Sequence, residues 1–196
     1  MIMISAKEIK LVRDRTGAGI ADVKRALEEA GGDIERASAI LERRIGGQAA
    51  KKAGRETRVG ILDAYVHANA RVASLVEVWC ETDFVARNEL FKAFAHDIAL
   101  QIAAMNPQYL SLDSIPREAW EAEKMQLEKE AEELNKPTEI KKEIVEEKLI
   151  SFFEDHTLLT QRFVKNGEKT IGALVQEMVG RFGENIQIGK FVRFSI

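Results

Sequence analysis

The spacing of apolar residues changes twice along this chain, and this change constrains the fold more than any other sequence feature. Apolar residues recur at helical intervals through residues 5–45, give way to β-rich runs at residues 59–67 and 71–81, and return to helical spacing from Phe84 onward. A helix requires a period near 3.6 residues and a strand a period of 2, so the chain must contain both. The pattern predicts an α+β protein that combines helices with antiparallel strands.

Residues 1–45 are predicted to form a module of three short helices. Ser5 and Glu8 stand at the spacing of a capping box, so the first helix should begin at the next residue after Ser5 and end at Gly17. A second amphipathic stretch stops at a pair of glycines, after which Asp33 can cap a third helix.

The rest of the chain divides into a linker and a larger domain. Residues 46–58 lose the apolar period and are rich in Gly, Ala and Lys, which predicts a linker with room for some helix. Residues 59–196 are predicted to form an α+β core and dimerisation domain. It should open with a strand hairpin and a helix carrying an apolar stripe over residues 84–105, include charged helical arms near residues 117–155, and close with a strand over residues 186–194.

The charge balance and the cysteine content narrow the class of protein. The chain has 29 Lys and Arg against 32 Asp and Glu, a formal net charge of −3, whereas proteins that bind duplexes usually carry a basic excess. The apolar stretch over residues 1–4 is short, and no later segment approaches the roughly 18 uncharged residues that span a bilayer. Cys80 is the single cysteine, so no intrachain disulfide can form. We therefore expect a cytoplasmic protein with no direct nucleic-acid or membrane partner.

No catalytic constellation is evident in the sequence. His67, His96 and His156 are far apart and fit no metal-binding pattern, and Cys80 lacks a local nucleophile signature, so it is expected to be a small core residue. The chain has neither a phosphate-binding glycine loop nor a dinucleotide fingerprint, and its many glutamates are expected to form a solvated helical face. We predict a protein that is not an enzyme and that needs no cofactor or metal.

Two segments resemble a known family. Residues 11–30, LVRDRTGAGIADVKRALEEA, resemble the ubiquitin-associated-like N-terminal module of the elongation factor Ts family, and residues 81–91, ETDFVARNELF, resemble its core signature. The likeness continues through IAAMNPQYLS, EEKLISFFEDHTLLTQRFVKNGEKTI and GENIQIGKFVRF, and so covers nearly the whole chain. With one copy of the core subdomain, the sequence resembles the short members of the family, which implies a homodimer.

The resemblance implies a guanine-nucleotide exchange factor that performs no covalent chemistry. Such a factor binds elongation factor Tu in its GDP form, disturbs the Mg²⁺ and phosphate site, and releases GDP so that GTP can bind. Asp83 and Phe84 would displace the elements that hold Mg²⁺, with Thr82 and Val85 supporting them. The resemblance also implies that the partner is contacted by Arg13, Thr16, Gly17, Ala18, Gly19, Ile20, Asp22, Val23, Lys24, Arg87 and Asn88.

Purely structural interpretations of the same residues remain open at this point. Phe84 can be the first core residue of the helix stripe and Asp83 its N-cap, and the glycines of residues 16–20 can simply permit a tight turn between helices. An adaptor that holds the GTPase without opening its nucleotide site, or nucleic-acid binding through the basic residues at 51–58, are the alternative functions. The strand at 186–194 is a candidate edge for dimer pairing.

Overall fold

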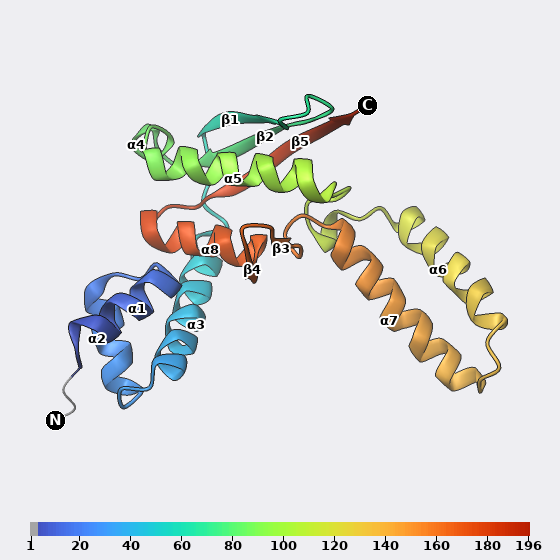
Figure 1. Ribbon diagram of the computed structural model, residues 1–196, viewed down its shortest axis with the longest axis horizontal. Helices are drawn as coiled ribbons and strands as arrows, with labels where there is room; N and C mark the ends of the chain where they lie inside the picture. Colours follow the sequence, from blue (N-terminus) through green and yellow to red (C-terminus); the bar gives the residue numbers. More distant parts are fainter. Residues whose placement is uncertain (1–3) are drawn as a thin grey trace.

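The computed structural model describes residues 4–196 and confirms the mixed helical and antiparallel architecture. A helical module lies at one end, an α+β core in the middle, and a helical hairpin projects from the other end (Figure 1). Met1–Met3, the start of the short apolar stretch, lie outside the described residues. Among the described helices, none combines the length and apolarity needed to cross a membrane.

The module contains α1 (Ala6–Thr16), α2 (Ile20–Glu29) and the first half of α3 (Ile34–Lys52). The predicted capping box is present: the Glu8 backbone N–H donates to Ser5 Oγ at 3.2 Å, and the Ser5 N–H donates to the Glu8 carboxylate at 2.6 Å. Gly17 ends α1 with a φ of 69°, and the Asp33 side chain caps α3. Local signals thus set these helix ends as predicted.

The third helix corrects the predicted linker. It does not end near residue 45 but continues through Gly46 and Gly47 to Lys52, so residues 46–52 are helical. Its second half packs on α8, where a Cβ placed on Gly180 would meet Ile45 Cγ2 at 3.4 Å. Each glycine disfavours the helix by about 1 kcal/mol, and packing against the core outweighs this cost.

The core is a three-stranded antiparallel sheet with the order β1-β2-β5, made of β1 (Val59–Val66), β2 (Val72–Cys80) and β5 (Gln187–Ser195). The helices α4 (Asp83–Ala86) and α5 (Glu89–Met105) follow β2, and α5 lies between one face of the sheet and α8 (Ile171–Phe182) (Figure 1). Phe91 of α5 is fully buried, and the centroid of its ring lies 6.2 Å from that of Phe182. Asn106 ends α5 in the left-handed conformation, and Pro107 follows it.

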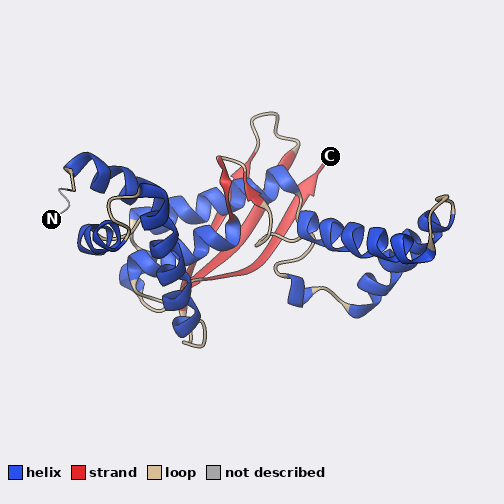
Figure 2. Cartoon of the chain, turned by 90° about the horizontal axis from the view of Figure 1, so that it is seen from below, coloured by secondary structure: helices blue, strands red, loops and turns tan. Residues whose placement is uncertain are grey.

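The helical arms pack mainly on each other and project away from the sheet (Figure 2). They are α6 (Arg117–Glu132) and α7 (Thr138–His156), preceded by the short helix η1 (Leu112–Ser114). The Trp120 ring stacks on Phe153 with centroids 4.6 Å apart, and these rings cap a small apolar core along the hairpin. After α7, β3 (Arg162–Phe163) and β4 (Asn166–Thr170) form a short hairpin, and the Thr170 side chain caps α8.

Candidate functional site

A single helical turn presents Phe84 to solvent. The turn α4 stands between the end of β2 and the start of α5, and Phe84 is 90% exposed within it. The next two residues, Val85 and Ala86, are buried at 7% and 6% exposure and attach the turn to the core. Phe84 is therefore not part of the apolar stripe of α5, and its interpretation as a core residue is wrong.

Glu184 holds this turn from the far end of the sequence. Its carboxylate accepts hydrogen bonds from the backbone N–H of Glu81 at 3.1 Å and of Thr82 at 3.0 Å, and from Thr82 Oγ1 at 2.6 Å. Gly183 ends α8 with a φ of 72°, which turns the chain so that Glu184 reaches the turn. Hydrogen bonds to an ionised carboxylate are stronger than neutral ones, so the backbone before Phe84 is firmly fixed.

A second set of bonds fixes the same turn to the segment after α3. The Glu81 carboxylate accepts from the Asn185 backbone N–H at 2.5 Å and lies 3.5 Å from the Arg55 guanidinium. The Asn185 side chain, only 3% exposed, donates to the Arg55 carbonyl at 2.7 Å. The turn, the end of α8 and the segment after α3 thus form one connected polar network.

Cys80 lies buried beneath the turn. Its Sγ donates to the Thr82 carbonyl at 3.3 Å and the residue is fully buried. Burial raises the pKa of the Cys80 thiol, and the Glu184 carboxylate raises it further. A thiol held protonated is a poor nucleophile, so Cys80 behaves as the small core residue that the sequence predicted.

The charged residues of the turn remain accessible. Asp83 pairs with Arg87 at 3.1 Å, but their side chains are 64% and 82% exposed, so the pair contributes little and can exchange partners. The alternative interpretation of Asp83 as an N-cap is wrong, because Thr82 is the N-cap of α4 and Asn88 that of α5. Asn88 Oδ1 accepts from the Leu90 N–H at 2.9 Å, which occupies that side-chain oxygen.

The module residues that the resemblance implies as partner contacts are partly buried inside the module and partly exposed on its surface. Val23 is fully buried, and Thr16 is 3% exposed with its hydroxyl donating to the Val12 carbonyl at 2.8 Å, so both side chains support the module from inside. Ile20 is 57% exposed at the start of α2. The other exposed members of the set are Arg13, Gly19, Asp22 and Lys24, with Gly17 and Ala18 partly buried.

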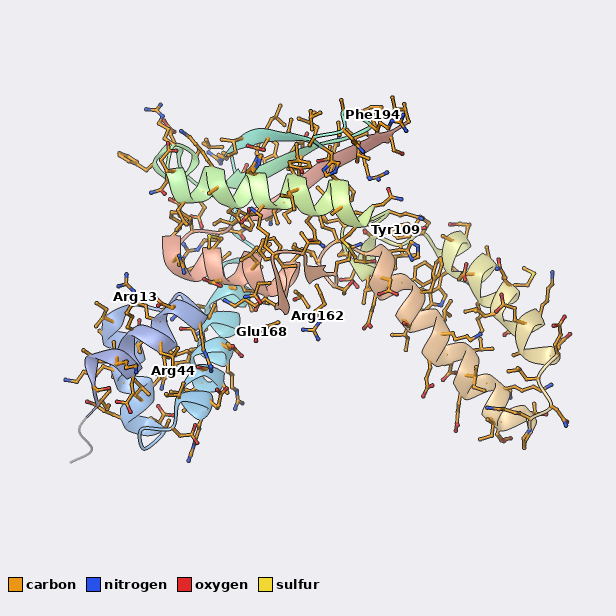
Figure 3. All side chains as sticks on the ribbon, in the orientation of Figure 1. Arg13, Arg44, Tyr109, Arg162, Glu168 and Phe194 are labelled. Carbon is orange, nitrogen blue, oxygen red and sulfur yellow. The ribbon has the colours of Figure 1, made fainter. Side chains whose placement is uncertain are left out.

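A cleft of about 810 Å³ lies between the module and the core, close to the turn. Arg13, Gly19 and Asp22 line its module side, while Leu90, at the start of α5, and Arg181 line its core side. Figure 3 shows Arg13 and Arg44, another lining residue, on the module at the end of the molecule where α4 also lies. Segments that are far apart in sequence thus border one surface.

Sequence reasoning missed Glu184 as a residue of this site. It lies about 100 residues after the turn that it binds, and no local pattern links the two segments. Within residues 4–196 no group of three or more His, Cys, Asp or Glu side chains is placed to hold a metal ion. The arrangement is an exposed aromatic ring on a fixed turn, flanked by exposed charges.

The chain is similar to known proteins over nearly its whole length. The family model described as Elongation factor TS matches residues 24–196. The protein named Elongation factor Ts of Rubrobacter xylanophilus is 49% identical, covering 97% of each chain. The protein of the same name from Thermosipho melanesiensis is 44% identical, and the match covers 99% of each chain. The one from Carboxydothermus hydrogenoformans is 46% identical, and the match covers 99% of this chain and 89% of the relative. The chain therefore belongs to the elongation factor Ts family of translation elongation factors.

Proposed function

We propose that this protein is a guanine-nucleotide exchange factor that binds elongation factor Tu in its GDP form and releases the GDP. The observation that carries the proposal is the 90% exposure of Phe84 on a turn fixed by Glu184. A large apolar side chain is normally buried, and one that is held outward on a fixed backbone is suited to enter another protein. Such a factor would act in the cytoplasm, where translation takes place.

The geometry supports displacement without covalent chemistry. A GTPase holds GDP through backbone donors around the phosphates and through Mg²⁺, so moving either group lowers nucleotide affinity. Phe84 would enter the partner's nucleotide-binding domain as a wedge while Asp83 competes for polar groups near the Mg²⁺ site. Thr82 and Val85 would hold Phe84 in its outward position, because Thr82 is hydrogen-bonded to Glu184 and Val85 is buried in the core.

The module would provide the first hold on the GTPase. Its exposed residues Arg13 and Asp22 line the cleft that ends near Leu90, and Ile20 and Lys24 are exposed on the same module in α2. Because binding of the factor and of GDP are coupled, GDP must weaken the factor's binding by the same degree that the factor weakens GDP binding. The factor therefore accelerates exchange in both directions and leaves the choice of nucleotide to the concentrations of GDP and GTP.

The test is the release of a fluorescent GDP from purified elongation factor Tu, with and without this protein. We expect strong acceleration by the wild-type protein and its loss in the variant that combines Asp83→Ala and Phe84→Ala. Met125→Ala, which removes an apolar side chain 54% exposed on the distant helical arm, is the matched control and should retain full activity. Stable binding of the GDP form without faster release would overturn the proposal and identify an adaptor.

We also propose that two copies associate through the face of the sheet that α5 does not cover. Leu62, Val66 and Phe194 on this face are 66%, 64% and 67% exposed, and Leu75 and Val192 add to the patch. Val66 and Phe194 flank Ala73 in register from either side, so the apolar residues are continuous across the three strands. Monomeric proteins rarely expose a contiguous apolar patch of this kind, and two such sheets can pack face to face.

The final strand, β5, supplies part of this interface. Among the described residues β5 lies at an edge of the sheet, and it contributes Val192 and Phe194 to the exposed face. Sedimentation equilibrium should give twice the 22.0 kDa chain mass for the wild-type protein and a mass near that of one chain for Phe194→Glu. Met125→Glu should remain a dimer, and a wild-type protein that is monomeric at tens of micromolar would refute the interface.

A further inference from the structure

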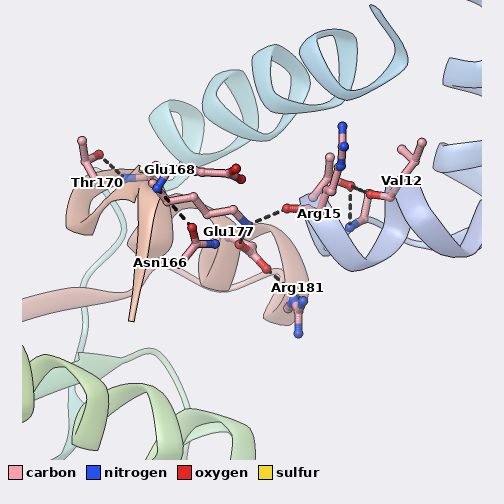
Figure 4. Close-up of polar contacts among 11 residues, drawn as sticks. Val12, Arg15, Asn166, Glu168, Thr170, Glu177 and Arg181 are labelled. Atoms are coloured by element: carbon pink, nitrogen blue, oxygen red, sulfur yellow. Dashed lines mark hydrogen bonds and ion pairs between the residues drawn. The ribbon is translucent and has the colours of Figure 1, made fainter. Parts of the chain in front are cut away.

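The end of α1 docks on an ion cluster of the core that is built around the buried carboxylate of Glu177. Lys169 Nζ donates to the Arg15 carbonyl at 2.5 Å and to the Glu177 carboxylate at 2.7 Å. The other oxygen of Glu177 accepts from Arg181 at 2.8 Å (Figure 4). Arg15 belongs to the module, whereas the three charged residues belong to β4 and α8 of the core. The contact therefore joins two parts of the molecule that are distant in sequence.

The chemistry of this contact favours one arrangement. The last carbonyls of a helix lack partners within the helix and carry partial negative charge, so an ammonium group is a favourable partner for the end of α1. Glu177 is only 8% exposed, and a buried carboxylate needs well-placed cationic partners to offset its loss of hydration. If the module moved away, Lys169 would lose the Arg15 carbonyl and no longer join the two parts.

Gly17 brings the module close enough to make this contact. A Cβ on Gly17 would lie 2.5 Å from both Arg181 Nε and Glu177 Oε1, which is closer than Cβ atoms approach other atoms in proteins. The glycine thus serves the docking as well as the left-handed cap of α1. The same short turn leads to Ile20, an exposed residue that we assign to the GTPase-binding surface.

We propose that Lys169, Glu177 and Arg181 form a latch that sets the orientation of the module relative to the Phe84 turn, and that exchange depends on this orientation. The inference rests on the proposed function. The module and the turn must engage the same GTPase together, and a fixed spacing makes insertion of Phe84 an intramolecular step at high effective concentration. Lys169 is a positioning residue, because it acts through the Arg15 carbonyl and not on the nucleotide site.

The latch can be tested by removing its ammonium group with Lys169→Met. Lys165→Met is the matched control, since Lys165 lies in the same hairpin but pairs with Asp97 of α5 at 2.5 Å instead of contacting the module. Lys169→Arg keeps the charge and serves as the rescue variant. Distances are measured by double electron–electron resonance between spin labels at Glu28→Cys and Lys92→Cys in a Cys80→Ala background. GDP release is measured over a range of factor concentrations.

The expected result is a broader distance distribution for Lys169→Met and a maximal stimulated release rate at least about fivefold lower, with a smaller change in the half-saturating concentration. Lys165→Met should match the wild type, and Lys169→Arg should recover most of both properties. Unchanged distances, or broadened distances with an unchanged maximal rate, would overturn the proposal. If the wild-type protein does not accelerate release, the proposed function fails, and the distances alone decide whether the latch holds the module.

Discussion

Replacing Phe84 with Ala separates the role of this ring in exchange from any role in folding. Full burial of a phenylalanine side chain contributes about 1.5–3 kcal/mol. Because Phe84 is 90% exposed in the free protein, nearly all of this free energy is available to a complex and little contributes to folding. If the ring becomes buried in the transition state for GDP release but not in the initial complex, its loss should lower the maximal stimulated rate by about 10- to 150-fold. The free energy of unfolding should change by less than about 0.5 kcal/mol.

The assay combines two measurements on the same preparations. Stopped-flow release of fluorescent GDP from elongation factor Tu gives the maximal rate and the half-saturating concentration, and urea unfolding gives the free energy of unfolding. Phe91→Ala is the contrasting variant, because Phe91 is fully buried and its loss should cost about 3–5 kcal/mol of stability. A Phe84→Ala protein with wild-type stimulated release would refute the wedge. A loss of stability comparable to that of Phe91→Ala would show that the Phe84 ring is packed in the free protein and would refute its exposure.

Three further predictions concern the support of the site. Glu184→Gln removes the charge from the hydrogen bonds that Glu184 accepts from Glu81 and Thr82. It should lower the free energy of urea unfolding by about 1–2 kcal/mol and slow the stimulated release of GDP. Unchanged values of both would show that Glu184 does not hold the turn. Gly17→Ala should lower the melting temperature by at least the equivalent of about 1 kcal/mol, because its φ is 69° and a Cβ there would clash. Gly19→Ala should cost less, because Gly19 has a φ of −64° and room for a Cβ, and Ala is only a poorer N-cap for α2. Because the folded state raises the Cys80 pKa, the stability tied to the protonated thiol is fully present below the ordinary pKa of 9.0 and declines as pH rises above it. Urea titrations from pH 8 to above pH 9.0 should show a steeper decline for the wild type than for Cys80→Ala, and equal slopes would contradict the assignment.

Signals between near neighbours in the chain were predicted from the sequence because their physical causes are local. The Ser5 capping box and the left-handed Gly17 each act within a single helical turn, and the structure has both. The strand hairpin was predicted in the same way, from two β-rich runs that are close together in the chain, and the structure pairs them.

Predictions failed where distant packing decided the outcome. The glycine pair at 46–47 reads as a break in the chain, but the packing of Ile45 on Gly180 keeps α3 helical across it. Phe84 fits the apolar stripe of the following helix by spacing alone. Asn88 starts a new helix after it, and this break in phase turns Phe84 away from the core.

By itself, the sequence determined the fold class, most helix ends, the likeness to the elongation factor Ts family and the stretch that carries the candidate site. Only the tertiary structure decided that Phe84 points outward, that Glu184 holds its turn, and that Lys169 joins the module to the core. The physical reason is the range of the interactions: caps and periodicity act over a few residues, whereas these carboxylate and ammonium contacts join segments 102 and 154 residues apart. Such pairings leave no local pattern, because any exposed Glu or Lys could have made them.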